Sequence, residues 1–355
     1  MRSPTPPAAV SDLGRLAYLD RLRAISIVAV VVLHAAAWNW STFDPSGSAW
    51  QTLNWADSAV RFSVPVFFMI SGSLFLDPKR NVTWRSLFRK SLPRLLVAFV
   101  VWSVFFALVG TYGPGGTGTL VSLATQIVLG HYHLWFLFAL VGLYLVTPIL
   151  RRVVTDRTTA WYFVGLAGVF ASVLPLLTHV PLAGKLLQTV LDTMQLQLVL
   201  GYTLYFVLGY LLSTARVSPK QLRWAFALGA AGIVVTAVGT SWLTQRGNEP
   251  NGLLYDYLTP GVVLSAVAVF LGVKAWSESR PQARPGHVVS TLSTYSFGIF
   301  LVHPLFQWGY QQFGITTAFA HPVSSVPLLA LMILVPSLLV AMLLRRMPRL
   351  GRFIA

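Results

Sequence analysis

Three residues of one apolar stretch could do chemistry together. Arg23 and His34 lie eleven positions apart, and eleven steps of a helix with 3.6 residues per turn make almost three whole turns. Both side chains therefore project from one helix face, about 16 Å apart along the axis. Asp20, three residues before Arg23, shares this face and can pair with the arginine.

These residue types favour different tasks at the two ends of the line. The planar N–H groups of Arg23 suit a phosphate-bearing ligand. The imidazole of His34 suits proton abstraction, because the ordinary pKa of histidine is close to neutrality. An ion pair that only anchors the helix explains Asp20 and Arg23 equally well. His34 has no charged neighbour in its own helix and is the stronger candidate for chemistry.

The composition determines which elements must position these residues. Of the 355 residues, 55% are hydrophobic and 10% are charged, whereas a soluble domain has about 25% charged residues. An ordinary soluble globular protein is excluded, because it would need a charged surface. The chain contains no cysteine, which excludes thiolate catalysis, an acyl-cysteine intermediate and disulfides.

Ten mostly apolar runs, separated by polar or turn-rich breaks, predict transmembrane helices. Barrel strands would be about half as long, so we expect an all-α polytopic membrane protein with about ten transmembrane helices. One transmembrane domain over residues 19–345 would lie between short cytoplasmic tails at 1–18 and 346–355. The predicted spans are 19–40, 55–76, 92–112, 134–151, 159–178, 198–214, 222–243, 257–276, 293–313 and 325–345.

The basic residues predict the orientation of these spans. Of 26 lysines and arginines, 23 fall in the N-terminal segment, in alternate loops or in the C-terminal segment. This asymmetry is the positive-inside pattern and predicts that both termini are cytoplasmic. The net charge of +16 therefore marks a membrane face, and no nucleic-acid partner is expected.

Other ionisable residues inside the spans are candidates for a buried polar chamber. Arg61 is predicted at the depth of His34, with Asp57 one turn away as its ion-pair partner. His303 is predicted at a similar depth, and Pro304 after it should free a backbone carbonyl. A structural salt bridge explains Asp57 and Arg61 at least as well as substrate binding does.

Weaker signals lie elsewhere in the chain. Ser71 belongs to a Ser-Gly-Ser segment that suits either ligand approach or close helix packing. His131 and His133 lack a third ligand pattern, so no metal site is expected. Trp135 is typical of a membrane-interface aromatic residue. The basic residues from Lys79 to Arg94 suit phosphate binding or topology signalling.

Several of these motifs together resemble the acyltransferase-3 family of integral membrane acyltransferases. The resemblance covers nearly the whole chain in the same order and is strongest to the branch of surface-polysaccharide O-acetyltransferases. The similar segments are Tyr18 to His34 with its Arg-x10-His pattern, Val64 to Ser73, Arg89 to Arg94, His133 to Leu137, Tyr144 to Pro148, and Ser293 to Pro304.

The resemblance implies a ten-helix acyltransferase that takes an acyl group, usually acetyl, from cytoplasmic acetyl-CoA to a hydroxyl on an extracytoplasmic glycan. It implies that His34 is the catalytic histidine and that Arg23 is essential. Pro93 stands directly before Arg94, earlier than the family pattern suggests, so the arginine that contacts CoA is left open. Together the residues and the resemblance give catalytic candidates His34, Arg23 and Asp20, and binding candidates Arg61, Ser71, Arg89, Arg94, Trp135, Tyr295 and His303.

The leading hypothesis is a multi-pass O-acyltransferase of a bacterial cytoplasmic membrane. His34 would deprotonate the acceptor hydroxyl, which attacks the thioester directly or through an acyl-histidine or acyl-serine relay. His303 or Arg61 would stabilise the oxyanion or hold an acidic acceptor. Acetyl-CoA is a co-substrate, no bound cofactor is expected, and the acceptor is an extracytoplasmic glycan, a lipid-linked sugar or a similar hydroxyl compound.

Two other classes of protein suit parts of the pattern. A transporter or flippase would also have ten spans and a polar chamber near the midplane, although no halves with matching broken helices are evident. A scaffold in a glycan-assembly complex would not need charges inside its spans.

Overall fold

The structure, a computed structural model, describes residues 9–114, 116, 118–181, 184–247, 249–280, 282–348 and 351–355. Across these ranges the chain forms helices and turns and no β-strand, which confirms the all-α prediction. The first eight residues of the expected N-terminal tail lie outside the described part. The rest of that tail already belongs to α1, which begins at Ala9.

The helices follow the predicted spans in order, and every predicted span lies on one or more of them. The longer helices are α1 (Ala9–Ala37), α2 (Ser48–Val60), α3 (Ser63–Phe75), α5 (Leu92–Tyr112), α7 (Trp135–Val153), α8 (Arg157–Ala167), α12 (Thr203–Thr214), α13 (Pro219–Gly247), α14 (Pro260–Glu278), α15 (His287–Gln312) and α16 (Pro322–Arg345). The remaining helices are α4 (Trp84–Ser86), α6 (Leu120–Leu129), α9 (Leu174–Leu177), α10 (Gly184–Met194), α11 (Gln197–Leu200) and α17 (Gly351–Ile354).

Eight helical segments among the described residues are long and apolar enough to cross a membrane, so the chain is a multi-pass membrane protein. Two predicted spans do not meet this standard. The first, on α1, has the charged residues Asp20, Arg21 and Arg23 near the middle of the helix. The sixth, on α12, has 12 residues, or about 18 Å of helix against a hydrocarbon core of about 30 Å. The count of ten stays a prediction.

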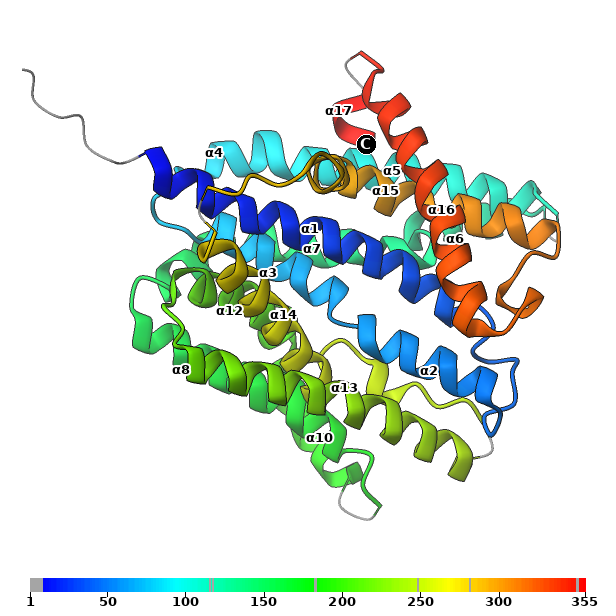
Figure 1. The fold of residues 1–355 in the computed structure, drawn as a ribbon, viewed down its shortest axis with the longest axis horizontal. Helices are drawn as coiled ribbons and strands as arrows, with labels where there is room; N and C mark the ends of the chain where they lie inside the picture. The colour runs from blue at the N-terminus through cyan, green and yellow to red at the C-terminus, as the bar shows by residue number, and fades with distance from the viewer. Residues whose placement is uncertain are drawn as a thin grey trace, which may run out of the picture.

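Helix α1 lies in the middle of the bundle. It packs against α2, α3, α14, α15 and α16, and in Figure 1 it crosses the centre of the view, with α3, α12 and α14 on one side and α5, α15 and α16 on the other. The line of residues from Arg23 to His34 is therefore surrounded by other helices instead of lipid.

A proline interrupts the second predicted span close to the site. Pro65 has no N–H for the carbonyl of Arg61 four residues earlier, and its ring would clash with that carbonyl. The helix accordingly ends at Val60 and resumes at Ser63. The break places Arg61 at a bend between α2 and α3.

A π-helical turn precedes α5. This turn, η1 (Leu87–Ser91), ends two residues before Pro93, which has no N–H for the carbonyl of Arg89. A π-helical turn is wider than an α-helical one and changes the direction of the side chains that follow. Ser91 and Arg94 both line the cavity described below.

Two glycines bring α3 and α12 into backbone contact. A β-carbon built at Gly72 would lie 1.8 Å from the carbonyl oxygen of Phe206, and one built at Gly209 would lie 2.1 Å from that of Met69. No side chain fits at either position. The glycine of the Ser-Gly-Ser segment thus serves close helix packing, while Ser71 lines a cavity.

The C-terminal residues 351–355 do not extend freely from the bundle. Helix α17 packs against α5 and α16, and Trp102 of α5 donates a hydrogen bond from Nε1 to the carbonyl of Ile354 at 3.2 Å. Within the expected tail over 346–355, residues 351–355 are therefore packed against the helices.

Candidate active site

A first cavity, of about 320 Å³, lies among α1, α3, α5, α7 and α15. Arg23 and Arg94 line it, and we call it the arginine cavity. Val30 also lines it, about 10 Å from Arg23 along α1. The cavity therefore has a basic end and an apolar end. Its other lining residues include Ser71, Ser91, Phe136, Tyr144, Ser296 and Phe300.

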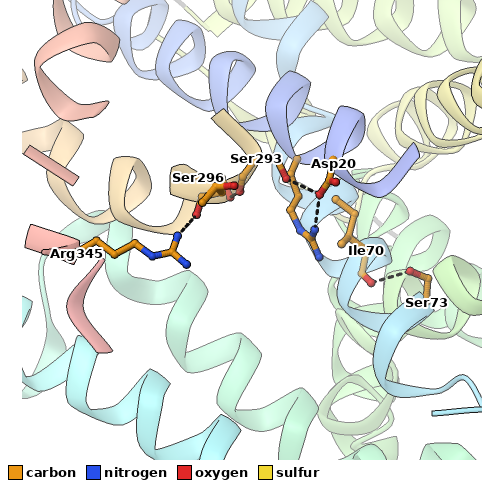
Figure 2. A network of polar contacts seen from close by, with 8 residues as sticks. Asp20, Ile70, Ser73, Ser293, Ser296 and Arg345 are labelled. Atoms are coloured by element: carbon orange, nitrogen blue, oxygen red, sulfur yellow. Dashed lines mark hydrogen bonds and ion pairs between the residues drawn. The ribbon is translucent and has the colours of Figure 1, made fainter. Parts of the chain in front are cut away.

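Asp20 holds Arg23 at the basic end. Arg23 donates from Nη1 to Oδ1 of Asp20 at 3.1 Å, and Ser293 of α15 donates its hydroxyl to the same oxygen at 2.7 Å. Figure 2 shows Asp20 and Ser293 pointing toward one another from α1 and α15. The predicted pair of Asp20 and Arg23 is present, and it also joins the two helices that carry the site.

A third arginine lies near the basic end, on α16. Arg345 donates from Nη1 to the carbonyl of Thr294 at 2.9 Å, on the opposite side of Ser296 from Asp20 in Figure 2. Its guanidinium is close enough to that of Arg94 for the two charges to repel. Neither arginine forms an ion pair with a carboxylate of the described chain. Unbalanced guanidinium groups at a cavity mouth suit an anionic ligand.

A second cavity, of about 350 Å³, lies at the other end of α1, and we call it the histidine cavity. Its lining is mainly polar and aromatic, which suits a ligand with hydroxyl groups. Within this cavity Gln307 donates to the carbonyl of His34 at 3.3 Å, and Tyr132 donates to Oε1 of Gln307 at 3.2 Å. The lining residues are His34, Ala37, Trp38, His131, Tyr132, Pro304, Gln307, Trp308 and Gln311.

Four imidazole rings gather where the two cavities approach each other. The ring centroids of His34 and His303 are 4.9 Å apart, and those of His303 and His133 are 5.5 Å apart. The Nδ1 atoms of His131 and His133 share a hydrogen bond of 2.8 Å. His303 and His133 are buried, whereas His34 is half-buried. His34 is thus the ring of the pair that a ligand can reach.

The two cavities end one helical turn apart. Val30 lines the arginine cavity and His34 the histidine cavity on α1. Phe300 and Pro304 occupy the same relation on α15. Four residues of helix span about 6 Å. The structure therefore places two separate cavities on either side of one narrow layer of side chains.

Arg61 lies beside this layer at the bend between α2 and α3. Its Nη2 donates to Oδ2 of Asp57 at 2.6 Å and its Nη1 to the carbonyl of Tyr255 at 3.2 Å. The predicted ion pair is present and buried. The positive charge of Arg61 lies close enough to His34 to interact electrostatically with its ring. The side chain of Arg61 also lines a third hollow, of about 550 Å³, with Trp40, Asp57 and Tyr257 among others.

Five predicted binding residues do not line the two cavities: Arg61 and His303, which lie beside them, and Arg89, Trp135 and Tyr295. The side chain of Arg89 is exposed on η1. Trp135 packs in an aromatic cluster, with its ring centroid 5.4 Å from that of Tyr202 and 5.5 Å from that of Tyr257. Tyr295 lies under Arg345, whose Cζ is 5.3 Å from the ring centroid. Of the two loop arginines named from the sequence, Arg94 is the one at the cavity.

The structure adds residues that sequence reasoning did not place at the site. Gln307 and Gln311 follow His303 at intervals of four, so the three side chains form one stripe along α15. From this spacing the sequence alone could have predicted that Gln307 and Gln311 share a helix face with His303. Arg345 and His131 come together with the site through contacts between distant segments, for which the sequence offered no local sign.

A larger groove, of about 810 Å³, lies away from this centre. Residues of α7, α8, η3 (Gly168–Val173), α9 and α12 line it. Most of its lining is apolar, which suits contact with lipid chains. Its size does not make it the reaction site, because the arginines and histidines described above do not line it.

The described residues include no group of three or more His, Cys, Asp or Glu side chains placed to hold a metal ion. Two of the four imidazoles, those of His131 and His133, hydrogen bond to each other.

Comparison with known proteins identifies the class. The model of the Acyl_transf_3 family, described as an acyltransferase domain, matches residues 16–346. Since the match covers almost the whole chain, the chain belongs to the acyltransferase-3 family and is a membrane acyltransferase. The family resemblance of the sequence motifs is thereby confirmed. No curated protein and no solved structure matches the chain.

Proposed function

We propose that this protein transfers an acetyl group from cytoplasmic acetyl-CoA to a hydroxyl of an extracytoplasmic glycan, as a surface-polysaccharide O-acetyltransferase would. The observation that supports this most directly is the pair of cavities that end one helical turn apart on α1 and α15, next to His34 and His303. A donor and an acceptor could enter from opposite sides and meet there. Proximity of this kind lowers the entropy cost of the reaction.

The arginine cavity suits the CoA thioester. Arg23, Arg94 and Arg345 gather at its basic end, where the phosphates of CoA would bind. The apolar end near Val30 and Phe300 suits the uncharged pantetheine arm and the acetyl group. In this assignment the basic end faces the cytoplasm.

The histidine cavity suits the acceptor. His34 would take the proton of the acceptor hydroxyl while the oxygen attacks the thioester carbonyl. Trp38 and Trp308 offer faces on which a sugar ring can pack, and the amides of Gln307 and Gln311 can hydrogen bond to hydroxyl groups. Direct attack needs no covalent enzyme intermediate.

This function requires a particular orientation in the membrane. We propose ten spans, with α1 and α12 as the two beyond the eight segments that are apolar enough by themselves, and both termini in the cytoplasm of a bacterial cell. The surroundings of α1 support its assignment, because its charged residues lie among other helices and Asp20 is paired with Arg23.

The test is acetyl transfer by the purified protein in detergent, with labelled acetyl-CoA and isolated envelope glycan. We expect His34→Ala to abolish transfer, because the general base is lost. His287 at the start of α15 is exposed, so His287→Ala is the matched control and should retain native activity. Full transfer by His34→Ala, with an unchanged amount of protein in the membrane, would disprove the mechanism.

A further inference from the structure

Pro304 leaves one backbone carbonyl of α15 without its helical partner. In an α-helix the N–H of residue 304 would donate to the carbonyl of residue 300, and proline has no N–H. Nδ1 of His303 lies 2.7 Å from the oxygen of Phe300 and 3.3 Å from that of Ile299. The imidazole therefore occupies the place of the missing backbone donor.

This contact determines the tautomer of His303. A carbonyl oxygen only accepts hydrogen bonds, so Nδ1 of His303 must carry the hydrogen. In the neutral ring Nε2 then has a free lone pair and no hydrogen. His303 is fully buried, and its Nε2 has no hydrogen-bond partner among the described residues. A buried, unpaired acceptor lowers stability, which points to a use for this atom.

The tautomer argues against one role expected from the sequence. A bare Nε2 cannot donate a hydrogen bond, so the neutral His303 ring cannot stabilise an oxyanion. It can accept a proton. The ring of His34 is its neighbour, with the centroids 4.9 Å apart.

The position of His303 relates the two cavities. It follows Phe300, which lines the arginine cavity, and precedes Pro304, which lines the histidine cavity. In the proposed reaction the acceptor loses a proton on one side of this layer. The CoA thiolate forms on the other side and must gain a proton to leave as the thiol. His303 lies between these two points.

We propose that His303 relays the proton from His34 to the sulfur of the departing CoA, with Pro304 and the carbonyl of Phe300 holding it in the tautomer that this requires. The inference rests on the function proposed above. The acceptor oxygen forms a bond to the acyl carbon while the carbon–sulfur bond breaks. The hydroxyl proton moves to His34, then to Nε2 of His303, and then to sulfur, so an ester and a thiol are formed and no further reactant is needed.

The test compares two acyl donors with the His303→Asn variant. The asparagine amide can still donate to the carbonyl of Phe300 but cannot take up a proton. With acetyl-CoA we expect kcat to fall by about a hundredfold or more, as for loss of a general acid. S-(4-nitrophenyl) thioacetate releases a thiolate that is stable without protonation. With this donor the ratio of variant to native activity should approach one.

Other outcomes separate this inference from the proposed function. An equal loss with both donors would overturn the relay, because the defect would then not depend on the leaving group. His34→Ala should lose activity with both donors, and if it does not, the proposed function itself fails. If His303→Asn folds poorly, His303→Gln takes its place, because glutamine also lacks a proton-accepting nitrogen. We expect the same result for it: a large loss of activity with acetyl-CoA and little loss with the activated thioester.

The role of Pro304 in fixing the tautomer of His303 has its own test. Pro304→Ala restores a backbone N–H that competes for the carbonyl of Phe300, so we expect a several-fold lower kcat with acetyl-CoA and little change with the activated thioester. Pro336 lies inside α16 and lines none of the cavities described, so Pro336→Ala is the matched control with native activity. Native activity of Pro304→Ala with acetyl-CoA would overturn the proposed role of Pro304 in fixing this tautomer.

Discussion

At the scale of single residues, the site depends on how few groups are ionisable in an apolar bundle. Asp20 accepts from both Arg23 and Ser293, so it positions the arginine and does not act alone. Arg61 has its charge balanced by Asp57. Removal of one partner from such a buried pair leaves an uncompensated charge. His34 differs from these residues, because no hydrogen bond to its ring is seen within the described chain.

The two loop arginines offer a prediction at this scale. Arg94 lines the arginine cavity and Arg89 is exposed away from it. We expect Arg94→Ala to raise the KM for acetyl-CoA about tenfold to a hundredfold, because a charge-assisted contact to phosphate is lost. Arg89→Ala is the control and should leave KM unchanged. Steady-state kinetics with purified protein check this, and a larger effect at Arg89 would place CoA elsewhere.

At the scale of elements, prolines and glycines decide where helices bend and how closely they pack. Pro65 breaks the helix after Val60 and places Arg61 at a bend. The π-helical turn before Pro93 directs Ser91 and Arg94 to the cavity. Each of these features is visible in the sequence as a proline, yet its consequence depends on how the helix accommodates the missing N–H.

The contact between α3 and α12 predicts a large effect of one methyl group. Gly209→Ala would force the two backbones apart, because the carbonyl of Met69 cannot give way as a flexible side chain could. We expect a loss of about 1–3 kcal/mol in the free energy of unfolding and a lower melting temperature in detergent. Gly165 of α8 has open space at its β-carbon, so Gly165→Ala should be neutral or stabilise by up to about 1 kcal/mol. Equal melting temperatures for the two variants would contradict the packing described here.

At the scale of the whole molecule, the apolar and the charged residues occupy different places. The apolar surface of the bundle suits lipid, and most basic residues lie in alternate connections between helices. Helix α1, with its polar line, lies among other helices. A bilayer would therefore contact apolar helices around a polar centre.

The proposed orientation predicts the labelling of single cysteines. The chain contains no cysteine, so any introduced one reports its position alone. Lys220 is exposed at the start of α13 and Glu249 is exposed just after its end, and α13 is long enough to cross a bilayer. In intact cells a membrane-impermeant maleimide should label Glu249→Cys and not Lys220→Cys, and permeabilisation should expose both. The reverse pattern would invert the proposed topology.

Sequence alone determined the all-α membrane architecture and the line from Arg23 to His34. Both follow from local rules, since bilayer thickness sets the length of an apolar helix and helical periodicity sets which residues share a face. The helix ends were less well predicted: α2 starts at Ser48, seven residues before the predicted span. Such ends depend on packing and capping beyond the bilayer core.

Only the tertiary structure decided how distant segments meet at the site. His34 and His303 are separated by 269 positions in the chain, yet the centroids of their rings lie 4.9 Å apart.

 The separation along the chain is too great for any local pattern to predict such a contact. The same holds for Arg345 beside Arg94 and for His133 beside His303 of α15. Pro304 and His303 are adjacent in the sequence, but the sequence alone does not show that Nδ1 of His303 faces the carbonyl of Phe300. Helix propensity and hydrophobicity act over a few residues, whereas the chemistry of this site arises from packing between helices that are far apart in the chain.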